Sequence, residues 1–389
     1  MTGMVAMQDA GRDFGLTDEQ RMMRESVQAL LARVLPREQI RSLDEAGEFP
    51  LAAYQALARD GWLGLPFPQA LGGAGGSFKD LTVFVEAVAW HSAQMASAWL
   101  TTAIYGGRQL LAGSEALKSE IMPGLLRGDT RLAFCLTEPH TGSDAASIRT
   151  RAVADGDDFV ITGHKTYITC AHVAHHLAVV TKTEPDAGTR GISIFLVDVR
   201  SPGLTVTPLK ALGRRMIHVN EVFFDSVRVP ASRMLGGRGE GWRNLMRGLN
   251  VERLCLAAAA SGNCQRIIDD ARDFALDRSA FGKRITEFQA VAHKFADMRI
   301  MAEAARTLTY RAAEMMDARL DPVTETTIAK VVATENNSRC ADIGIQIMGG
   351  AGYMMDHAMQ MYFRDARVGT IGGGTSEIMR SIIAKRMGL

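Results

Sequence analysis

Apolar residues recur at helical spacing through the first third of the chain. In LTDEQRMMRESVQALLARVL (16–35), Thr17 and Gln20 stand at the spacing of a capping box. The apolar positions that follow share one helical face: Met23, Val27, Leu30, Leu31 and Val34. Similar patterns continue to about residue 130, interrupted by glycine and proline. Residues 1–130 are therefore predicted to form an all-helical domain.

Short β-branched segments, separated by turn residues, replace this pattern in the middle of the chain. Examples are RLAFCLT (131–137), DFVITGHKTYIT (158–169) and GISIFLVDV (191–199). After GGRGEGW (236–242), long helical patterns return and continue to the end. The predicted fold class is α+β, in the order helices, sheet, helices. Its β-domain covers residues 131–237, and a second helical domain covers 238–389.

Composition limits the partners and the compartment. Lys and Arg number 44 and Asp and Glu 43 among 389 residues, so a formal charge of +1 gives no electrostatic basis for a nucleic-acid or anionic-membrane partner. Five cysteines are scattered without a C-x-x-C pair, which favours a reduced compartment and a cytoplasmic location. Neither a signal peptide nor a membrane span is expected from the sequence.

Glycine-rich stretches give the first indication of a ligand. No G-x-G-x-x-G lies between a strand and a helix, which disfavours a nicotinamide-binding Rossmann domain. We interpret LGGAGG (71–76) as a chain reversal. In GGGTSEI (372–378), three glycines precede a helix that Thr375 can cap, which is the arrangement of an anion site at a helix N-terminus. CLTEPHTGSDAASI (135–148) adds hydroxyl and backbone donors suited to a planar or phosphorylated ligand.

Five motifs together resemble those of the acyl-CoA dehydrogenase family, and they occur in the family's order. They are CLTEPHTGSDAAS (135–147), YIT (167–169), RSAFGKRITEFQ (278–289), QIMGGAGYMMDHAMQMYFRDAR (346–367) and GGGTSE (372–377). The resemblance covers nearly the whole chain. It implies an N-terminal helical domain, a central β-barrel-like domain and a C-terminal four-helix bundle. Two positions depart from the usual motifs: Tyr167 replaces a tryptophan, and Met361 replaces a basic residue.

The resemblance implies FAD as the cofactor and suggests its contacts. Around the flavin ring it places Phe134, Leu136, Thr137, Gly142, Ser143, Tyr167, Ile168 and Thr169. For the pyrophosphate and adenosine part, reached across a subunit boundary, it implies Arg278, Phe281, Gln289, Gln346, Gly349 and Gly350. Thr375 and Glu377 would hold the FAD phosphates from the glycine loop.

The resemblance also indicates where the catalytic base lies. Oxidation between the α and β carbons of an acyl thioester needs a carboxylate that removes the α-proton. The best-known branch of the family carries it in the glycine loop, where this chain has Gly373. A second branch, which includes isovaleryl-CoA and long-chain enzymes, carries it in a D-x-E-R pattern. NVER (250–253) corresponds to this pattern, with Asn250 where the family usually has Asp. Glu252 would then be the base, and the backbone N–H of Gly373 would serve the thioester oxygen. The expected substrate contacts are Ser143, Asn250, Arg253 and Gly374.

The residues around Glu252 allow two interpretations. An apolar run follows it (254–260), so its carboxylate is expected to border a dry cavity that raises its pKa. Alternatively, Glu252 simply favours the first turns of a helix through the macrodipole, or pairs with a neighbouring arginine. Within SAWLTTAIYGGRQLL (97–111), which is expected to border the acyl end, Trp99 is a candidate for shortening the pocket.

The resemblance implies an acyl-CoA substrate, an electron-transfer flavoprotein as electron acceptor, and a homotetramer built as a dimer of dimers. Alternatives are an enzyme of the same scaffold that uses oxygen or acts on carrier-protein-bound acyl groups, and a flavin-binding protein without turnover. The crowded histidines of HVAHH (172–176) have no partner carboxylate on a helix, so no metal site is expected.

Overall fold

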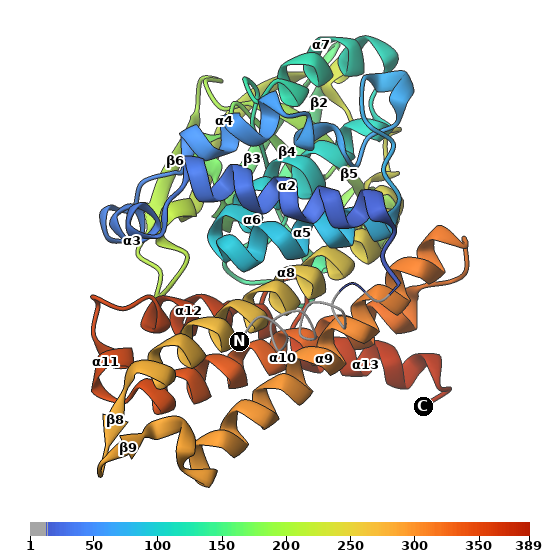
Figure 1. Ribbon diagram of the computed structural model, residues 1–389. Helices are drawn as coiled ribbons and strands as arrows, with labels where there is room; N and C mark the ends of the chain where they lie inside the picture. Colours follow the sequence, from blue (N-terminus) through green and yellow to red (C-terminus); the bar gives the residue numbers. More distant parts are fainter. Residues whose placement is uncertain (1–12, 14) are drawn as a thin grey trace.

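The computed structural model describes Asp13 and residues 15–389, and it confirms the predicted order of helices, sheet and helices (Figure 1). The first part contains α2 (Asp18–Val34), α3 (Arg37–Ala46), α4 (Leu51–Arg59), α5 (Phe78–His91), α6 (Ala93–Leu100) and α7 (Glu115–Leu126). The strands are β1 (Leu132–Cys135), β2 (Arg151–Asp155), β3 (Asp158–Thr169), β4 (His176–Lys182), β5 (Ile192–Asp198), β6 (Leu204–Leu209) and β7 (Val219–Pro230). The last part contains α8 (Gly241–Asp277), β8 (Ser279–Ala280), β9 (Lys283–Arg284), α9 (Gln289–Asp317), α10 (Val323–Met348), α11 (Gly350–Tyr353), α12 (Met359–Ala366) and α13 (Ser376–Arg386).

The start of α2 follows the local sequence signal. The backbone N–H of Gln20 donates to Thr17 Oγ1 at 3.2 Å, and the N–H of Thr17 donates to Gln20 Oε1 at the same distance, 3.2 Å. This confirms the predicted capping box. Val27, Leu30 and Leu31 are buried on the predicted apolar face.

The sheet has two covered faces in its centre. Its strand order is β1-β4-β2-β3-β7-β6, with β5 paired to β4; β4 runs parallel to β1 and β2 and antiparallel to β5. Alternate residues of β4 and β5 belong to two different hydrophobic clusters. One cluster lies inside the β-domain, and the other also contains residues of α7. This explains why β4 and β5 read as continuous apolar runs, because a strand buried on both faces has no polar side.

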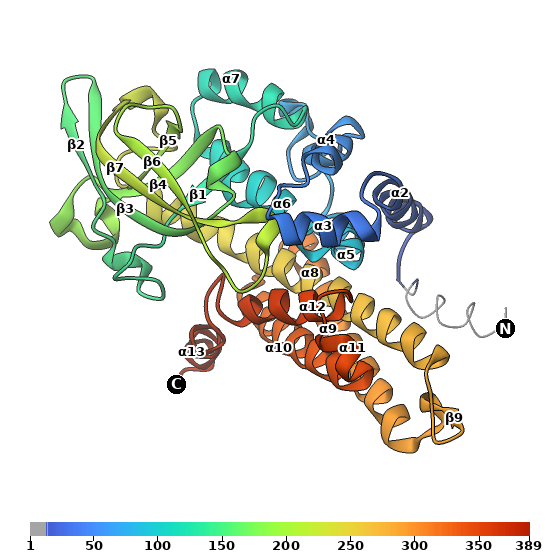
Figure 2. The ribbon, with the colours of Figure 1, turned by 90° about the vertical axis from the view of Figure 1, so that its left-hand side faces the viewer.

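The N-terminal and C-terminal helices share one hydrophobic core. Leu31 and Trp99 from the first part belong to the same cluster as Ala257 and Cys340 from the last part. Figure 2 shows α8 running from beneath the sheet into the C-terminal helical domain, where it packs with α9 and α10. The predicted domain boundaries therefore stay predictions, since the two helical parts are not separated by a break in the core.

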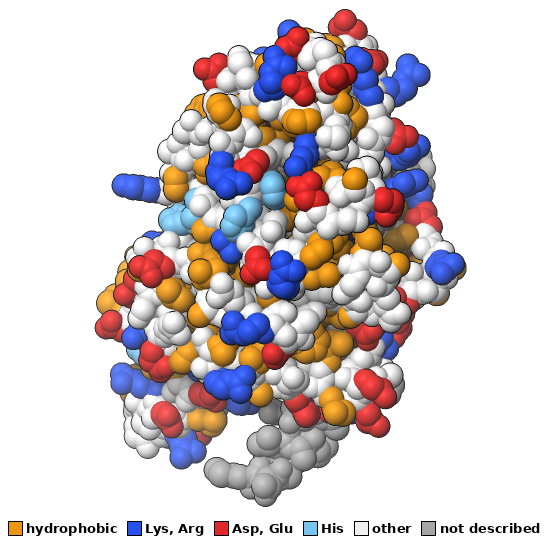
Figure 3. Space-filling view, turned by 90° about the horizontal axis from the view of Figure 1, so that it is seen from above, with side chains coloured by type: hydrophobic (Ala, Val, Ile, Leu, Met, Phe, Trp, Pro, Cys, Tyr) orange, Lys and Arg blue, Asp and Glu red, His pale blue; other side chains and the backbone are white. Residues whose placement is uncertain are grey.

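The surface agrees with a nearly neutral chain. On the face seen in Figure 3, basic and acidic side chains are interspersed around a group of histidines. Within residues 13 and 15–389, no group of three or more His, Cys, Asp or Glu is placed to hold a metal ion. None of the helices described combines the length and apolar character that a membrane span needs.

Candidate active site

Glu252 and Gly373 lie next to each other, although they belong to α8 and to the loop before α13. A Cβ atom placed on Gly373 would lie 3.2 Å from Glu252 Oε1 and only 2.3 Å from Leu256 Cδ1. Gly373 has a φ of +65°, a backbone conformation that favours glycine. The loop can therefore approach the carboxylate closely only because residue 373 has no side chain.

The carboxylate of Glu252 is half-buried and has no hydrogen-bond donor or ion-pair partner among the described residues. Burial raises its pKa to about 7, while the positive charges of Arg253 and Lys330 act in the opposite direction. A carboxylate that is desolvated and unpaired is a stronger base than one on the surface. Such a group is suited to removing a proton from carbon.

The alternative interpretation, in which Glu252 only stabilises a helix N-terminus or pairs with an arginine, does not fit its position. The sequence interpretation placed Glu252 before or within the first turns of a helix, but α8 begins at Gly241, so Glu252 lies well inside it. The favourable effect of a helix N-terminus on a carboxylate fades beyond the first turn. No arginine lies within ion-pair distance of its oxygens in the described part of the chain. Neither the macrodipole nor a salt bridge accounts for this residue.

Tyr105 is an aromatic residue that interacts electrostatically with Glu252. It lies in a π-helical segment (Thr101–Gly106), a type of turn that is frequent at functional sites. Burial, with a contribution from the negative charge of Glu252, raises the pKa of Tyr105 well above its usual range. Trp99, the sequence candidate, instead packs in the core against Phe84, with ring centroids 4.7 Å apart. Sequence reasoning missed Tyr105 because no local pattern marks a π-turn.

Arg253 and Asn250 lie in the seam between α8 and α10. Arg253 is only 7% exposed, and its Nη1 lies 3.5 Å from Asn250 Oδ1, a long contact. Thr326 Oγ1, from α10, donates to the same oxygen at 3.4 Å. The buried Nε of Arg253 has no partner among the described groups. Arg253 therefore has an unused donor beside Glu252, and its role as a substrate contact stays a prediction.

Lys330 is a residue that sequence reasoning missed. Its side chain is fully buried, and its Nζ donates to the backbone carbonyl of Gly374 at 2.6 Å. Burial lowers its pKa to about 8, while the negative charge of Glu252 opposes this shift. The only sequence signal is a lysine in an otherwise apolar helical stretch, IAKVV (328–332).

The predicted flavin-ring residues gather where β1 and β3 leave the sheet. The N–H of Thr166 donates to the carbonyl of Thr137 at 2.9 Å, which joins the two motifs. Below them, buried Lys165 donates to the Leu136 carbonyl at 2.9 Å and to Glu138 Oε1 at 2.8 Å. This buried pair, which the sequence did not reveal, fixes the two segments relative to each other.

The surface above this pair fits a planar ring. The Tyr167 side chain is 65% exposed, and its backbone φ of +59° is unusual for a residue other than glycine. A Cβ on Gly142 would meet only Thr137 Cγ2, at 4.0 Å, so the space above the loop is open. Phe134, Leu136, Thr169 and Ser143 are partly or fully exposed as well. Ile168 is buried in the β-domain core, so only its backbone is available to a cofactor.

A second predicted group lies at the far end of the C-terminal helical domain, by β8, β9 and α11 (Figure 1). Phe281 is 96% exposed, with a φ of +52°, and Arg278 and Gln289 are exposed beside it. Gly349 and Gly350 have open space around them, and Gln346 is exposed. Within one chain this group does not meet the flavin-ring group. Its assignment to FAD in a second subunit stays a prediction.

At the start of α13, Thr375 Oγ1 accepts the N–H of Ile378 at 3.2 Å and so caps the helix. The backbone N–H groups of Gly373 and Gly374 have no acceptor among the described residues. Glu377 is exposed in the first turn. Free N–H groups at a helix N-terminus suit an anion or a carbonyl oxygen.

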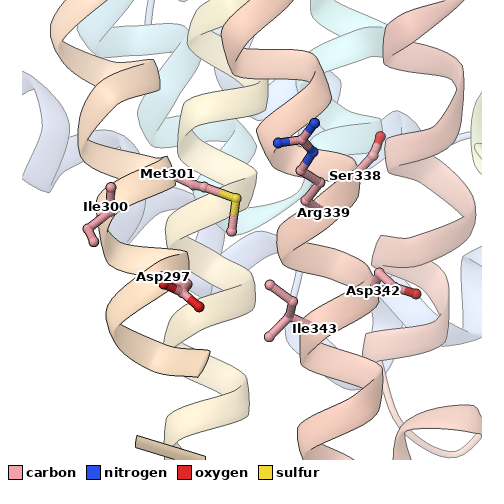
Figure 4. Close-up of a pocket in the computed structure, with 7 residues that line it drawn as sticks. All are labelled: Asp297, Ile300, Met301, Ser338, Arg339, Asp342 and Ile343. Carbon is pink, nitrogen blue, oxygen red and sulfur yellow. The ribbon is translucent and has the colours of Figure 1, made fainter. Parts of the chain in front are cut away.

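A separate groove between α9 and α10 has a volume of about 610 Å³ (Figure 4). Met301 and Ile343 reach into the space between the two helices, and Arg339 and Asp342 lie along it. The groove contains none of the residues around Glu252. It is therefore separate from the candidate active site.

The family comparisons agree with this geometry. Three family descriptions match successive parts of the chain: the N-terminal domain of acyl-CoA dehydrogenase over residues 17–129, the middle domain over 133–227 and the C-terminal domain over 239–388. The caffeyl-CoA reductase-Etf complex subunit CarC of Acetobacterium woodii is 34% identical over 95% of this chain and 98% of its own length.

Two solved structures are similar over nearly their whole length. Butyryl-CoA dehydrogenase from Megasphaera elsdenii has a TM-score of 0.92 at 29% identity, covering 97% of this chain and 100% of the other. The prolyl acyl carrier protein oxidase AnaB also has a TM-score of 0.92, at 27% identity, covering 96% of this chain and 100% of the other. The matched domains, the fold and the shared length together lead to one conclusion: this chain belongs to the acyl-CoA dehydrogenase family.

Proposed function

We propose that this protein is an FAD-dependent acyl-CoA dehydrogenase that converts an acyl-CoA thioester into the trans-2-enoyl-CoA. The observation that carries the proposal is the unpaired, half-buried carboxylate of Glu252 beside the backbone of Gly373. The family depends on FAD, and the exposed surface at Tyr167 and Gly142 fits the flavin ring. When bound there, FAD supplies the acceptor for the hydride that leaves the β-carbon.

The chain's own residues would prepare the α-carbon. Glu252 takes the α-proton, which a base with a pKa of about 7 can do near neutral pH. The free N–H of Gly373 donates to the thioester carbonyl and stabilises the negative charge that develops on its oxygen. Arg253 keeps a positive charge beside the base, and Tyr105 and Leu256 restrict water around it.

The proposal also includes the direction of the reaction and the electron acceptor. CarC is named as a reductase that works in a complex with an electron-transfer flavoprotein. We infer that this chain also exchanges electrons with an electron-transfer flavoprotein, and that oxidation of the thioester is its physiological direction. The exposed residues by β8 and β9 support a homotetramer in which Arg278, Phe281 and Gln289 reach the FAD of another subunit.

A second candidate function has a specific observation behind it. AnaB, whose structure is similar over the whole chain, is named as an oxidase of a carrier-protein-bound prolyl group. An oxidase or a carrier-protein enzyme of the same scaffold would keep the FAD surface and the base. A flavin-binding protein without turnover would not need an unpaired carboxylate with a raised pKa.

One anaerobic titration separates these functions. Purified holoprotein is mixed with straight-chain, branched, aromatic and dicarboxylic acyl-CoAs, and the loss of oxidised-flavin absorbance is followed. Rapid bleaching with an acyl-CoA, and slow recovery in air, supports the dehydrogenase. Rapid recovery in air would indicate an oxidase. Absence of bleaching with every CoA thioester, but bleaching with acyl-carrier protein, would show that the carrier was assigned wrongly.

A further inference from the structure

Lys330 is a buried cation with few partners. Its side chain is 0% exposed, and the hydrogen bond that the structure shows for its ammonium group goes to the Gly374 carbonyl, at 2.6 Å. A lysine ammonium has three donors, and burying a charge is costly unless it is compensated. A neutral donor could hold the same carbonyl, so this hydrogen bond alone does not explain why a charged residue stands here.

The loop that Lys330 holds is the loop that touches the base. Gly374 follows Gly373, whose backbone approaches Glu252 so closely that a Cβ would lie 3.2 Å from Oε1. Both glycines have positive φ, +65° and +91°, so the loop keeps an unusual conformation at this point. The hydrogen bond from α10 therefore holds this loop at its contact with α8.

Charged residues on three helices interact with Lys330. Lys330 interacts electrostatically with Glu252 and Arg253 on α8, with Glu335 on its own helix α10, and with Glu377 on α13. Glu252 in turn interacts with Arg253 and Lys330, and it contributes to the pKa of Tyr105 in the π-helical segment. Glu335 pairs with Arg380, whose Nη1 lies 2.6 Å from Glu335 Oε1, so its charge is already compensated. Glu252 and Glu377 have no ion-pair partner among the described residues, and of these two Glu377 is exposed whereas Glu252 is half-buried.

We propose that Lys330 is a positioning residue for the base: its buried ammonium seats the glycine loop against Glu252 and supplies the positive charge that faces this carboxylate from α10. The proposal rests on the proposed function, since it gives the base its setting. Lys330 contacts neither substrate nor cofactor in it. The lysine acts through the Gly374 carbonyl and through its charge.

Two variants test the charge and the hydrogen bond of Lys330 together. Lys330→Met removes both, whereas Lys330→Arg keeps a charge and a donor. On the acid side of its pH profile, the flavin-bleaching rate falls as Glu252 becomes protonated, and we call this fall the acid limb. Because Lys330→Met removes a positive charge near Glu252, we expect the acid limb to move to higher pH by roughly one unit, the size of effect that one nearby opposite charge produces. Lys330→Arg should recover most of this shift. Thr334→Val, one turn further along α10 with its Oγ1 bonded to the Lys330 carbonyl at 2.8 Å, is the matched uncharged control and should not move the limb.

A stability cycle tests the same pair without turnover. Urea unfolding is measured for Lys330→Met, Glu252→Gln and the double variant. If the two charges compensate each other, Lys330→Met should destabilise the protein less in the Glu252→Gln background than in the wild type. If Lys330→Met alone does not fold, the double variant should recover folded protein.

Several results would overturn the proposal. They are an unmoved acid limb in Lys330→Met, additive unfolding free energies in the cycle, or a double variant that fails to fold although Glu252→Gln folds. The two proposals can fail separately. Additivity together with a bleaching rate abolished by Glu252→Gln would reject the role of Lys330 but keep the dehydrogenase. If the unfolding free energies of the two variants are coupled but no thioester bleaches the flavin, the dehydrogenase is rejected and the interaction of Lys330 with Glu252 is kept.

Discussion

The carboxylate of Glu252 and the backbone of Gly373 occupy adjoining space, with Leu256 filling the remaining room. A Cβ on Gly373 would lie 3.2 Å from Glu252 Oε1 and 2.3 Å from Leu256 Cδ1. In the best-known branch of the family the base would stand at residue 373. Here the two positions are neighbours in space, so either could place a carboxylate near the same α-carbon, but not without a change at Leu256.

Replacing Glu252, the proposed base, should slow flavin reduction without preventing the binding of an acyl-CoA. Glu252→Gln keeps the size of the side chain and removes its ability to accept a proton, so we expect flavin bleaching by a good acyl-CoA to slow about 10²- to 10⁴-fold. Stopped-flow absorbance measures the rate, and FAD content checks integrity. Glu303→Gln, at a partly exposed residue of α9 that pairs with Arg299, is the matched control. A wild-type bleaching rate in Glu252→Gln would refute the assignment.

The bleaching rate should depend on pH through Glu252. Because only the deprotonated carboxylate is a base, and burial raises its pKa to about 7, the rate should rise through about pH 7 and then level off. Rates with a slow substrate over pH 5.5 to 8.5, an interval of about three units centred on this pKa, test the expectation. A limb near the ordinary value of 4.5 would show that Glu252 is solvated and is not the desolvated base described here.

Glu252 should also affect stability, with a defined sign. Its pKa is raised on folding from 4.5 to about 7, so between these values the folded protein holds a proton that the unfolded chain has released. The favourable contribution is complete below about pH 4.5 and is lost as the pH rises towards 7. Urea unfolding at several pH values should show this loss in the wild type and a flatter profile in Glu252→Gln. Parallel profiles would contradict the raised pKa.

The tight fit at Gly373 predicts a position-specific cost. Gly373→Ala places a Cβ against Leu256 at a φ of +65°, so we expect a loss of about 1–3 kcal/mol in the free energy of unfolding. Gly372→Ala is the matched control, since its Cβ would meet only Val368, with the carbonyl oxygen 3.6 Å away. A double variant that moves the carboxylate, Glu252→Gly with Gly373→Glu, should need Leu256→Ala before it folds well. Equal effects of Gly372→Ala and Gly373→Ala would show that the packing does not control this loop.

The buried pair of Lys165 and Glu138 should stabilise the surface at Tyr167 and Gly142 that is proposed to bind the flavin ring. Both are buried and joined at 2.8 Å, so Lys165→Met leaves a buried carboxylate without its cation, a change that costs about 3–5 kcal/mol in comparable cases. Thermal unfolding and FAD retention after gel filtration measure the effect. The double variant Lys165→Met with Glu138→Gln should be less destabilised than Lys165→Met alone. If Lys165→Met kept wild-type stability and FAD content, the pair would not support this surface.

The sequence predicted those features that depend on nearby residues. The capping box at Thr17, the apolar stripe of α2, the change to β-branched strands and the glycine loop before α13 all follow from local patterns. The proposed base, Glu252, was identified through a motif rather than through its surroundings. The sequence did not show how far inside α8 Glu252 lies, because Glu240 before the helix provides no side-chain cap and so leaves no local signal for the start at Gly241.

Contacts between distant segments were decided by the tertiary structure alone. Sequence by itself determined the family, the order of helices and sheet, and Glu252 as the candidate base. Only the folded chain shows that Lys330 donates to the carbonyl of Gly374 in the glycine loop and that Lys165 pairs with Glu138. The same holds for the electrostatic interaction of Tyr105 with Glu252 and for the packing of Trp99 in the core. The physical reason is that burial and charge compensation depend on which elements pack together, and residue spacing along one helix or strand does not specify its neighbours.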